Sequence, residues 1–77
     1  MLDDADRILF AELGDGGQVV RYEGGGWWLE HPKNPKLPGR SVSLYGAVAL
    51  AHSPGATVHH GQLGGSRFYE ELRRYQG

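Results

Sequence analysis

The sequence contains no cysteine, which excludes disulfides, thiolate metal ligands and thiol nucleophiles. It has no apolar run near the roughly 20 residues that a membrane-spanning helix needs, so we expect no membrane partner. Its first residues, MLDDADR, are acidic where an export signal would be basic and then apolar, which predicts a cytoplasmic protein. Its 77 residues predict one small domain, residues 1–77, with a thin core.

Acidic residues are absent from one long stretch, residues 31–69, which carries the bases Lys33, Lys36, Arg40 and Arg67. The formal net charge of the whole chain is nevertheless -1, because the acids gather near the start. The stretch is either a solvated run of charge or a basic patch for an acidic partner or for phosphates. Four dispersed bases are few for a protein that binds nucleic-acid duplexes tightly.

Glycine is over-used, with 13 residues that stand mostly in short clusters between apolar runs. Such clusters are typical of turns rather than of long flexible linkers. Residues 18–23 (QVVRYE) and 27–31 (WWLEH) are rich in β-branched and aromatic side chains, and three glycines join them. This pattern predicts a β-hairpin. Residues 56–60 (ATVHH) alternate and predict a third, short strand.

An N-terminal helix is expected over residues 3–13. Asp3 or Asp4 can cap it, and Leu9 and Leu13 fall on one face at helical spacing. The glycines that follow would then end the helix.

A central helix is expected over residues 44–52, whose sequence is LYGAVALAH. Ser41 or Ser43 can cap it, and Leu44 and Val48 share one face. The small residues of this helix allow close packing on a sheet.

The end of the chain, residues 66–75, is ambiguous. We favour a strand over residues 66–69 with a helix from Glu70, although the helical spacing of Phe68, Leu72 and Tyr75 supports a helix throughout. The predicted fold is α+β: a small antiparallel sheet of three or four strands, a central helix packed on it, and an additional N-terminal helix on the other face or at an edge. The predicted core consists of Val20, Tyr22, one of Trp27 and Trp28, Leu29, Leu44, Val48, Ala51, Val58 and Phe68.

Three segments carry a resemblance to a known family: QVVRYEGGGW at 18–27, SLYGAVALA at 43–51 and ATVHHGQLGG at 56–65. Through them, the chain from residue 18 onward resembles a small bacterial family of unknown function that is built as hairpin, helix and hairpin. The prolines at 32–38, the second Trp, the shorter helix and the acidic start depart from that family. The resemblance implies a fold and no activity.

Trp27 and Trp28 are adjacent, so on a strand their side chains leave by opposite faces. One of them then belongs to the core, and the other is a contact anchor on the outer face unless the N-terminal helix covers it. The loop that follows is long and polar. Its prolines at every third position either stiffen it or form a polyproline II edge.

The four histidines, His31, His52, His59 and His60, lack the spacing of metal ligands, so we expect no metal and no cofactor. No nucleophile elbow, phosphate loop or recognisable carboxylate pair points to an enzyme. We therefore expect a non-enzymatic protein-interaction module, a regulator or inhibitor of a larger protein machine. The alternative is nucleic-acid binding through the basic stretch 33–67, and an exposed sheet edge favours a homodimer. The expected partner-binding residues are Trp27, Trp28, Lys33, Lys36, Arg40 and Arg67.

Overall fold

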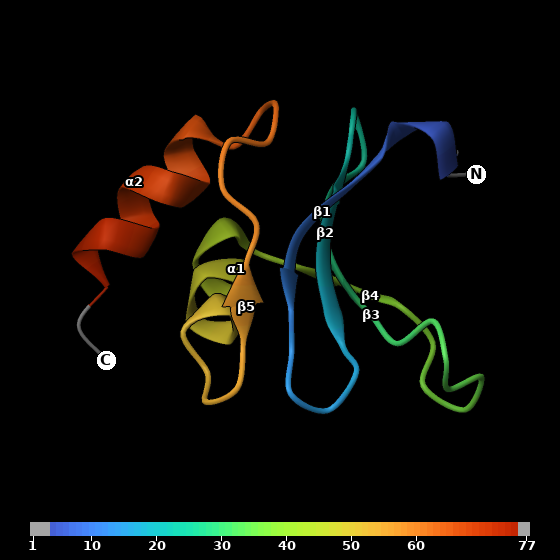
Figure 1. Cartoon of the computed structure of the whole chain (residues 1–77). Helices are drawn as coiled ribbons and strands as arrows, with labels where there is room; N and C mark the ends of the chain where they lie inside the picture. The colour runs from blue at the N-terminus through green and yellow to red at the C-terminus, as the bar shows by residue number, and fades with distance from the viewer. Residues whose placement is uncertain (1–3, 76–77) are drawn as a thin grey trace.

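The computed structural model describes residues 4–75. Five strands form one antiparallel sheet in the order β4-β3-β2-β1-β5, and two helices lie together on one side of it (Figure 1). The chain is therefore an α+β protein, as the sequence predicts, although the sheet has five strands rather than three or four. The elements are η1 (Asp4–Asp6, a 3-10 turn), β1 (Arg7–Glu12), β2 (Gln18–Tyr22), β3 (Gly26–Glu30), β4 (Arg40–Val42), α1 (Leu44–Ala51), β5 (Thr57–Val58) and α2 (Ser66–Arg74).

The predicted hairpin is confirmed as β2 and β3. Val20 lies opposite Trp28, and the turn closes with a hydrogen bond of 2.9 Å from the Gly25 N–H to the Tyr22 carbonyl. Gly24 and Gly26 each have a φ of +78°, a conformation that only glycine adopts without strain. Gly24 and Gly26 are therefore required by the turn.

The expected N-terminal helix is wrong, because residues 7–12 form strand β1 and pair with β2. The segment alternates: Ile8 and Phe10 pack with the core, whereas Arg7 and Leu9 lie on the other face. As a strand, the segment can pair with β2 and at the same time bury its core face, and this outweighs its helical spacing. Asp3, one of the two expected caps, lies outside the described residues.

The glycine-rich segment after β1 is a hairpin turn and not a helix end. The Leu13 N–H donates to the Gly17 carbonyl at 2.8 Å, and the Asp15 carboxylate accepts from the Gly17 N–H at 2.8 Å. An Asp-Gly pair between two alternating segments is a strong hairpin signal. The chain therefore begins with a three-stranded meander, β1-β2-β3.

The central helix is confirmed as α1. Its cap is Ser43, whose hydroxyl accepts from the Gly46 N–H at 2.9 Å, while Ser41 belongs to β4. Val48 and Ala51 face the sheet and are buried.

The preferred strand over residues 66–69 is wrong, and the alternative helix is right: Ser66–Arg74 is α2. The strand expected as its partner, β5, is only two residues long and pairs with β1 instead. The helix places Phe68 in the core, and an ion pair of 3.0 Å joins Glu70 to Arg74 on its surface. Neither α1 nor α2 has the length and apolar character that crossing a membrane requires.

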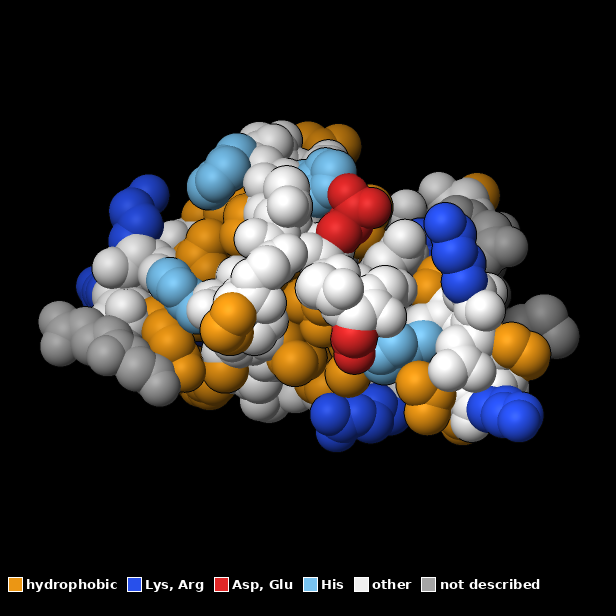
Figure 2. All heavy atoms as spheres, turned by 60° about the horizontal axis from the view of Figure 1, so that its bottom comes forward, with side chains coloured by type: hydrophobic (Ala, Val, Ile, Leu, Met, Phe, Trp, Pro, Cys, Tyr) orange, Lys and Arg blue, Asp and Glu red, His pale blue; other side chains and the backbone are white. Residues whose placement is uncertain are grey.

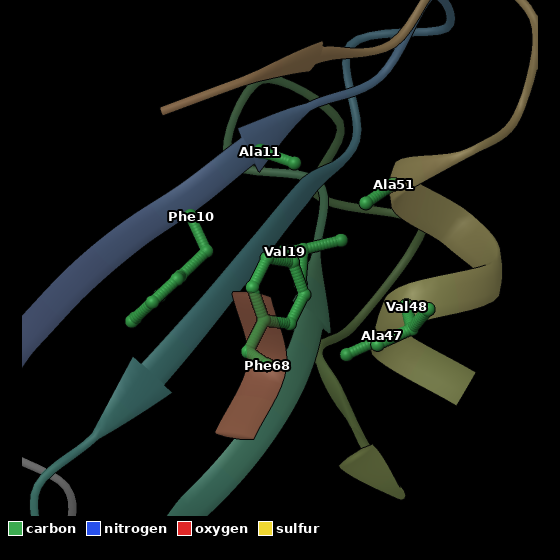
Figure 3. Close-up of a cluster of buried hydrophobic side chains, with 7 residues drawn as sticks. All are labelled: Phe10, Ala11, Val19, Ala47, Val48, Ala51 and Phe68. Atoms are coloured by element: carbon green, nitrogen blue, oxygen red, sulfur yellow. The ribbon is translucent and has the colours of Figure 1, made fainter. Parts of the chain in front are cut away.

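The core lies between the sheet and the two helices (Figure 3). Of the predicted core, Val20, Tyr22, Leu29, Val48, Ala51 and Phe68 are buried, and the other members are partly buried. The prediction missed β1 altogether, and with it Phe10, which with Phe68 is one of the two largest fully buried side chains of the described residues. The buried cluster comprises Phe10, Ala11, Val19, Ala47, Val48, Ala51 and Phe68.

Gly65, the N-cap residue of α2, has no room for a side chain beside the core. A Cβ atom there would overlap the ring of Phe10 and lie 2.8 Å from Cε2 of Tyr69. We expect Gly65→Ala to lower the free energy of unfolding by about 1–3 kcal/mol, as overpacking does. Urea denaturation checks this. Gly14→Ala is the matched control, because its Cβ would come no closer than 3.5 Å to another atom, and equal effects of the two changes would contradict the packing described here.

Candidate functional site

The sheet has a second face that neither α1 nor α2 covers, which we call the open face. Val19 belongs to the core, whereas its neighbour Val20 lies on the open face between Leu9 and Trp28 of the adjacent strands. Val20 is nevertheless fully buried. Side chains of the open face itself must therefore cover it.

Four polar side chains cross the open face and form what we call the Arg7–Glu30 cluster: Arg7, Gln18, Tyr22 and Glu30. The Arg7 Nε donates to one Glu30 oxygen at 2.8 Å, and the Tyr22 hydroxyl donates to the other at 2.6 Å. The Arg7 Nη2 donates to the Gln18 side-chain oxygen. Arg7 and Tyr22 lie at one end of the strands and Gln18 and Glu30 at the other, so these bonds run across Val20.

The cluster holds its charges in a partly desolvated place, because the Arg7 and Glu30 side chains are only 23% and 21% exposed. Burial alone would lower the pKa of Arg7, but the hydrogen bond and the charge of Glu30 outweigh it, and this pKa is raised. Burial, and then the hydrogen bond to Glu30, raises the pKa of Tyr22. Tyr22 therefore stays a neutral donor at physiological pH.

A cavity of about 590 Å³, widely open to solvent, lies between this cluster and the 31–39 loop, which joins β3 to β4. The loop comes close to the cluster at Gly39, where a Cβ atom would lie 3.2 Å from Cγ of Glu30. The volume falls within the range of small-ligand and side-chain pockets. The cavity is lined by Arg7, Gln18, Tyr22, Glu30, His31, Pro32, Leu37 and Gly39.

The 31–39 loop is folded into consecutive turns. The Asn34 N–H donates to the His31 carbonyl at 3.0 Å, and the Leu37 N–H donates to the Asn34 carbonyl at 3.0 Å. The Asn34 side chain also accepts from the Lys36 N–H at 3.1 Å. A polyproline II helix has no internal hydrogen bonds, so that interpretation of the prolines is wrong and stiffening of the loop is the better one.

The loop is tied to the β1–β2 turn by His31. Its Nε2 lies 3.5 Å from the Asp15 carboxylate. The Gly17 N–H, and then His31, lower the pKa of Asp15. The start of the loop is therefore held in place beside the cavity.

The two tryptophans leave β3 by opposite faces, as predicted. Trp27 packs in the core, stacked on Phe68 at 5.0 Å between ring centres. Trp28 lies half-buried on the open face, where its ring meets that of Tyr22 edge-on and its Nε1 donates to the Gly25 carbonyl at 2.8 Å. Trp28 is therefore the tryptophan that a partner of the open face can reach.

The structure brings together three of the four predicted cations. Lys33 and Lys36 are exposed on the 31–39 loop, and Arg40 is exposed where β4 begins. Basic side chains gather at this end of the molecule (Figure 2). Arg67 is exposed on α2, which lies on the other side of the molecule from the loop (Figure 1).

The other histidines make separate structural contacts. His59 Nε2 lies 2.8 Å from the Glu12 carboxylate, and His52 Nε2 lies 2.8 Å from the Leu72 carbonyl. The ring of His60 stacks on that of Tyr69. Within residues 4–75, no group of three or more His, Asp or Glu side chains could hold a metal ion.

Sequence reasoning missed the whole Arg7–Glu30 cluster. Arg7 and Glu30 are 23 positions apart, and they meet only because β1 is a strand beside β2. The available signal was the alternation of Arg7 to Phe10 followed by an Asp-Gly turn.

Comparison of the chain with protein-family models, with curated proteins and with solved structures finds no match. The resemblance to a hairpin–helix–hairpin family stays a prediction. The arguments about function below therefore rest on the site alone.

Proposed function

We propose that this chain is a small non-enzymatic protein-interaction module, a regulator or inhibitor of a larger protein. Its partner binds the open face together with the 31–39 loop and Arg40. The observation that carries the proposal is the placement of Trp28 on the face that neither α1 nor α2 covers, next to a loop with exposed cations.

The chemistry of this surface supports a protein partner. Aromatic and Arg side chains are enriched among the residues that dominate binding energy in protein interfaces. Leu37, on the loop, is 47% exposed and adds an apolar contact beside the cavity. The fixed turns of the loop reduce the entropy that binding would cost.

Nucleic-acid binding has weaker support. That alternative used four cations, and Arg67 belongs to α2, which lies on the other side of the molecule from the 31–39 loop (Figure 1). Three exposed bases provide few phosphate contacts.

The test is a double variant, Lys36→Glu with Arg40→Glu, compared with the unchanged protein in a pull-down from lysate of the source cells. Both side chains are exposed, so we expect the fold to be kept and the captured partner to be lost. The measurement is the amount of that partner by mass spectrometry, with the thermal melt as the check on folding.

The matched control is Arg67→Glu with Arg73→Glu, which makes the same change in net charge at exposed positions of α2. It should leave the partner bound. Retention of the partner by the loop variant would refute the proposed surface. If the captured partner is a nucleic acid whose affinity falls steeply with salt, the protein-binding proposal is wrong.

A further inference from the structure

The cavity between the Arg7–Glu30 cluster and the 31–39 loop offers hydrogen-bond donors. Both oxygens of Glu30 are already occupied, by Arg7 and by Tyr22. Arg7 uses Nε toward Glu30 and Nη2 toward Gln18, and it also interacts with the Tyr22 hydroxyl. Nη1 is the nitrogen that the bonds to Glu30 and Gln18 leave to donate to a ligand. Gln18 accepts through its oxygen, which leaves its amide N–H groups to donate.

The Nη edge of an Arg side chain can bind a carboxylate with two parallel hydrogen bonds. Nη2 of Arg7 already donates to Gln18, so a carboxylate at this edge would share Nη2 with the Gln18 oxygen and take Nη1 alone. Here Glu30 holds the guanidinium from the Nε side, so the rotamer of Arg7 is set before a ligand arrives. Glu30 is in this sense a positioning residue, because it acts through Arg7.

Charge around the cavity favours an anion of low charge. The loop from His31 to Arg40 contains three bases and no acid, and its lysines are exposed. The carboxylate of Glu30 next to the donors would repel a doubly charged phosphate more than it repels a carboxylate. Pro32 and Leu37 provide an apolar wall.

We propose that this cavity binds an acidic side chain of an extended, acidic segment of the partner protein, with Arg7 and Gln18 as the donors. The inference rests on the proposed function and names the chemistry of the partner. Neighbouring residues of the segment then contact Trp28 and the lysines of the loop. A peptide fits better than a free organic acid because these contacts lie outside the cavity, on the exposed surface around it.

The experiment measures peptide binding by calorimetry and by the change in Trp fluorescence. The probe is a blocked peptide, N-acetyl-Glu-Leu-Glu-Leu-Glu-amide, and the matched probe has Gln in place of each Glu. We expect the acidic peptide to bind about tenfold or more tightly than the neutral one, because the lost hydrogen bonds are charge-assisted. Equal binding of the two peptides would overturn the proposal.

Two variants assign the binding to the cavity. Arg7→Lys keeps the charge and loses the paired donors, so we expect the acidic peptide to bind about tenfold more weakly. Gln18→Glu keeps the side-chain shape and an acceptor for Arg7, but it replaces the amide donors with a negative charge, so we expect binding to be lost. Gln62→Glu adds the same charge in the loop before α2 and should bind as the unchanged protein does. Full affinity in Gln18→Glu, with an unchanged melt, would refute the cavity as the site.

Further measurements distinguish an acidic peptide from other occupants of the cavity. If glutarate alone binds as tightly as the peptide, the cavity is a site for small organic acids and the peptide proposal is wrong. If sedimentation shows a dimer that Gln18→Glu dissociates, the occupant is a second copy and the proposal is again wrong. Failure of the peptide to bind, together with a partner that is lost in Lys36→Glu with Arg40→Glu, would refute this inference and leave the proposed function standing.

Discussion

Replacing Phe10 with alanine is expected to lower the free energy of unfolding by about 3–5 kcal/mol, a large part of what a domain of this size has. Phe10 is fully buried, and only Phe68 is a fully buried side chain of the same size among the described residues. Its ring meets those of Trp27 and Phe68 edge-on, with centres 4.7 and 5.2 Å away. Alanine would remove these contacts and leave a cavity in the core, on the face of β1 that is turned toward the two helices.

Urea denaturation followed by circular dichroism measures the loss. The control is Tyr45→Ala, which removes an aromatic ring that is 61% exposed on α1 and should change the free energy of unfolding by no more than about 0.5 kcal/mol. Similar losses of unfolding free energy for the two variants would mean that the Phe10 ring of β1 does not belong to the core.

The elements that the sequence predicts well are those whose signals are local. Three glycines between two β-branched and aromatic runs predict the β2–β3 hairpin, and Ser41 or Ser43 predicts the start of α1, where Ser43 proves to be the cap. The opposite faces of Trp27 and Trp28 follow from the geometry of a strand alone. The exposure of Lys33, Lys36 and Arg40 follows from their place in a polar loop.

The elements that the sequence predicts poorly depend on distant partners. Residues 7–12 have both helical spacing and alternation, and only the presence of β2 beside them decides for a strand. Strand β4 is three residues long and follows a proline-rich loop, so no run of β-forming residues announces it. Residues 66–69 were ambiguous because Phe68 could reach a core from a strand or from a helix.

The same cause explains why the candidate site was found only in part. The cations of the loop are neighbours in the sequence, whereas Arg7, Gln18 and Glu30 come from three strands. Because residues 7–12 were predicted to be a helix, the predicted site did not include Arg7, which is the main donor in the cavity. The open face was likewise not predicted, because the expected N-terminal helix was placed either on that face of the sheet or at an edge.

Val48→Asp is expected to unfold the domain or to lower its free energy of unfolding by about 3–5 kcal/mol, because it places an unpaired carboxylate in the core. Val48 is only 2% exposed and lies on α1 where the helix meets the sheet. Nearby, the buried cluster offers aromatic rings and aliphatic groups and no cation. The charge can therefore be neither hydrated nor paired without opening the helix from the sheet.

The thermal melt and the dispersion of the amide proton NMR signals measure this effect, and Tyr45→Asp supplies the comparison. Tyr45 stands in the first turn of the same helix with 61% of its surface exposed, so an acid there is hydrated and interacts favourably with the helix dipole. The same charge on the same helix should thus be harmless at one position and severe three residues later. A folded Val48→Asp variant with an unchanged melt would show that α1 does not pack on the sheet through this face. The assignment of one face of the sheet as covered by the helices and the other as open would then be wrong.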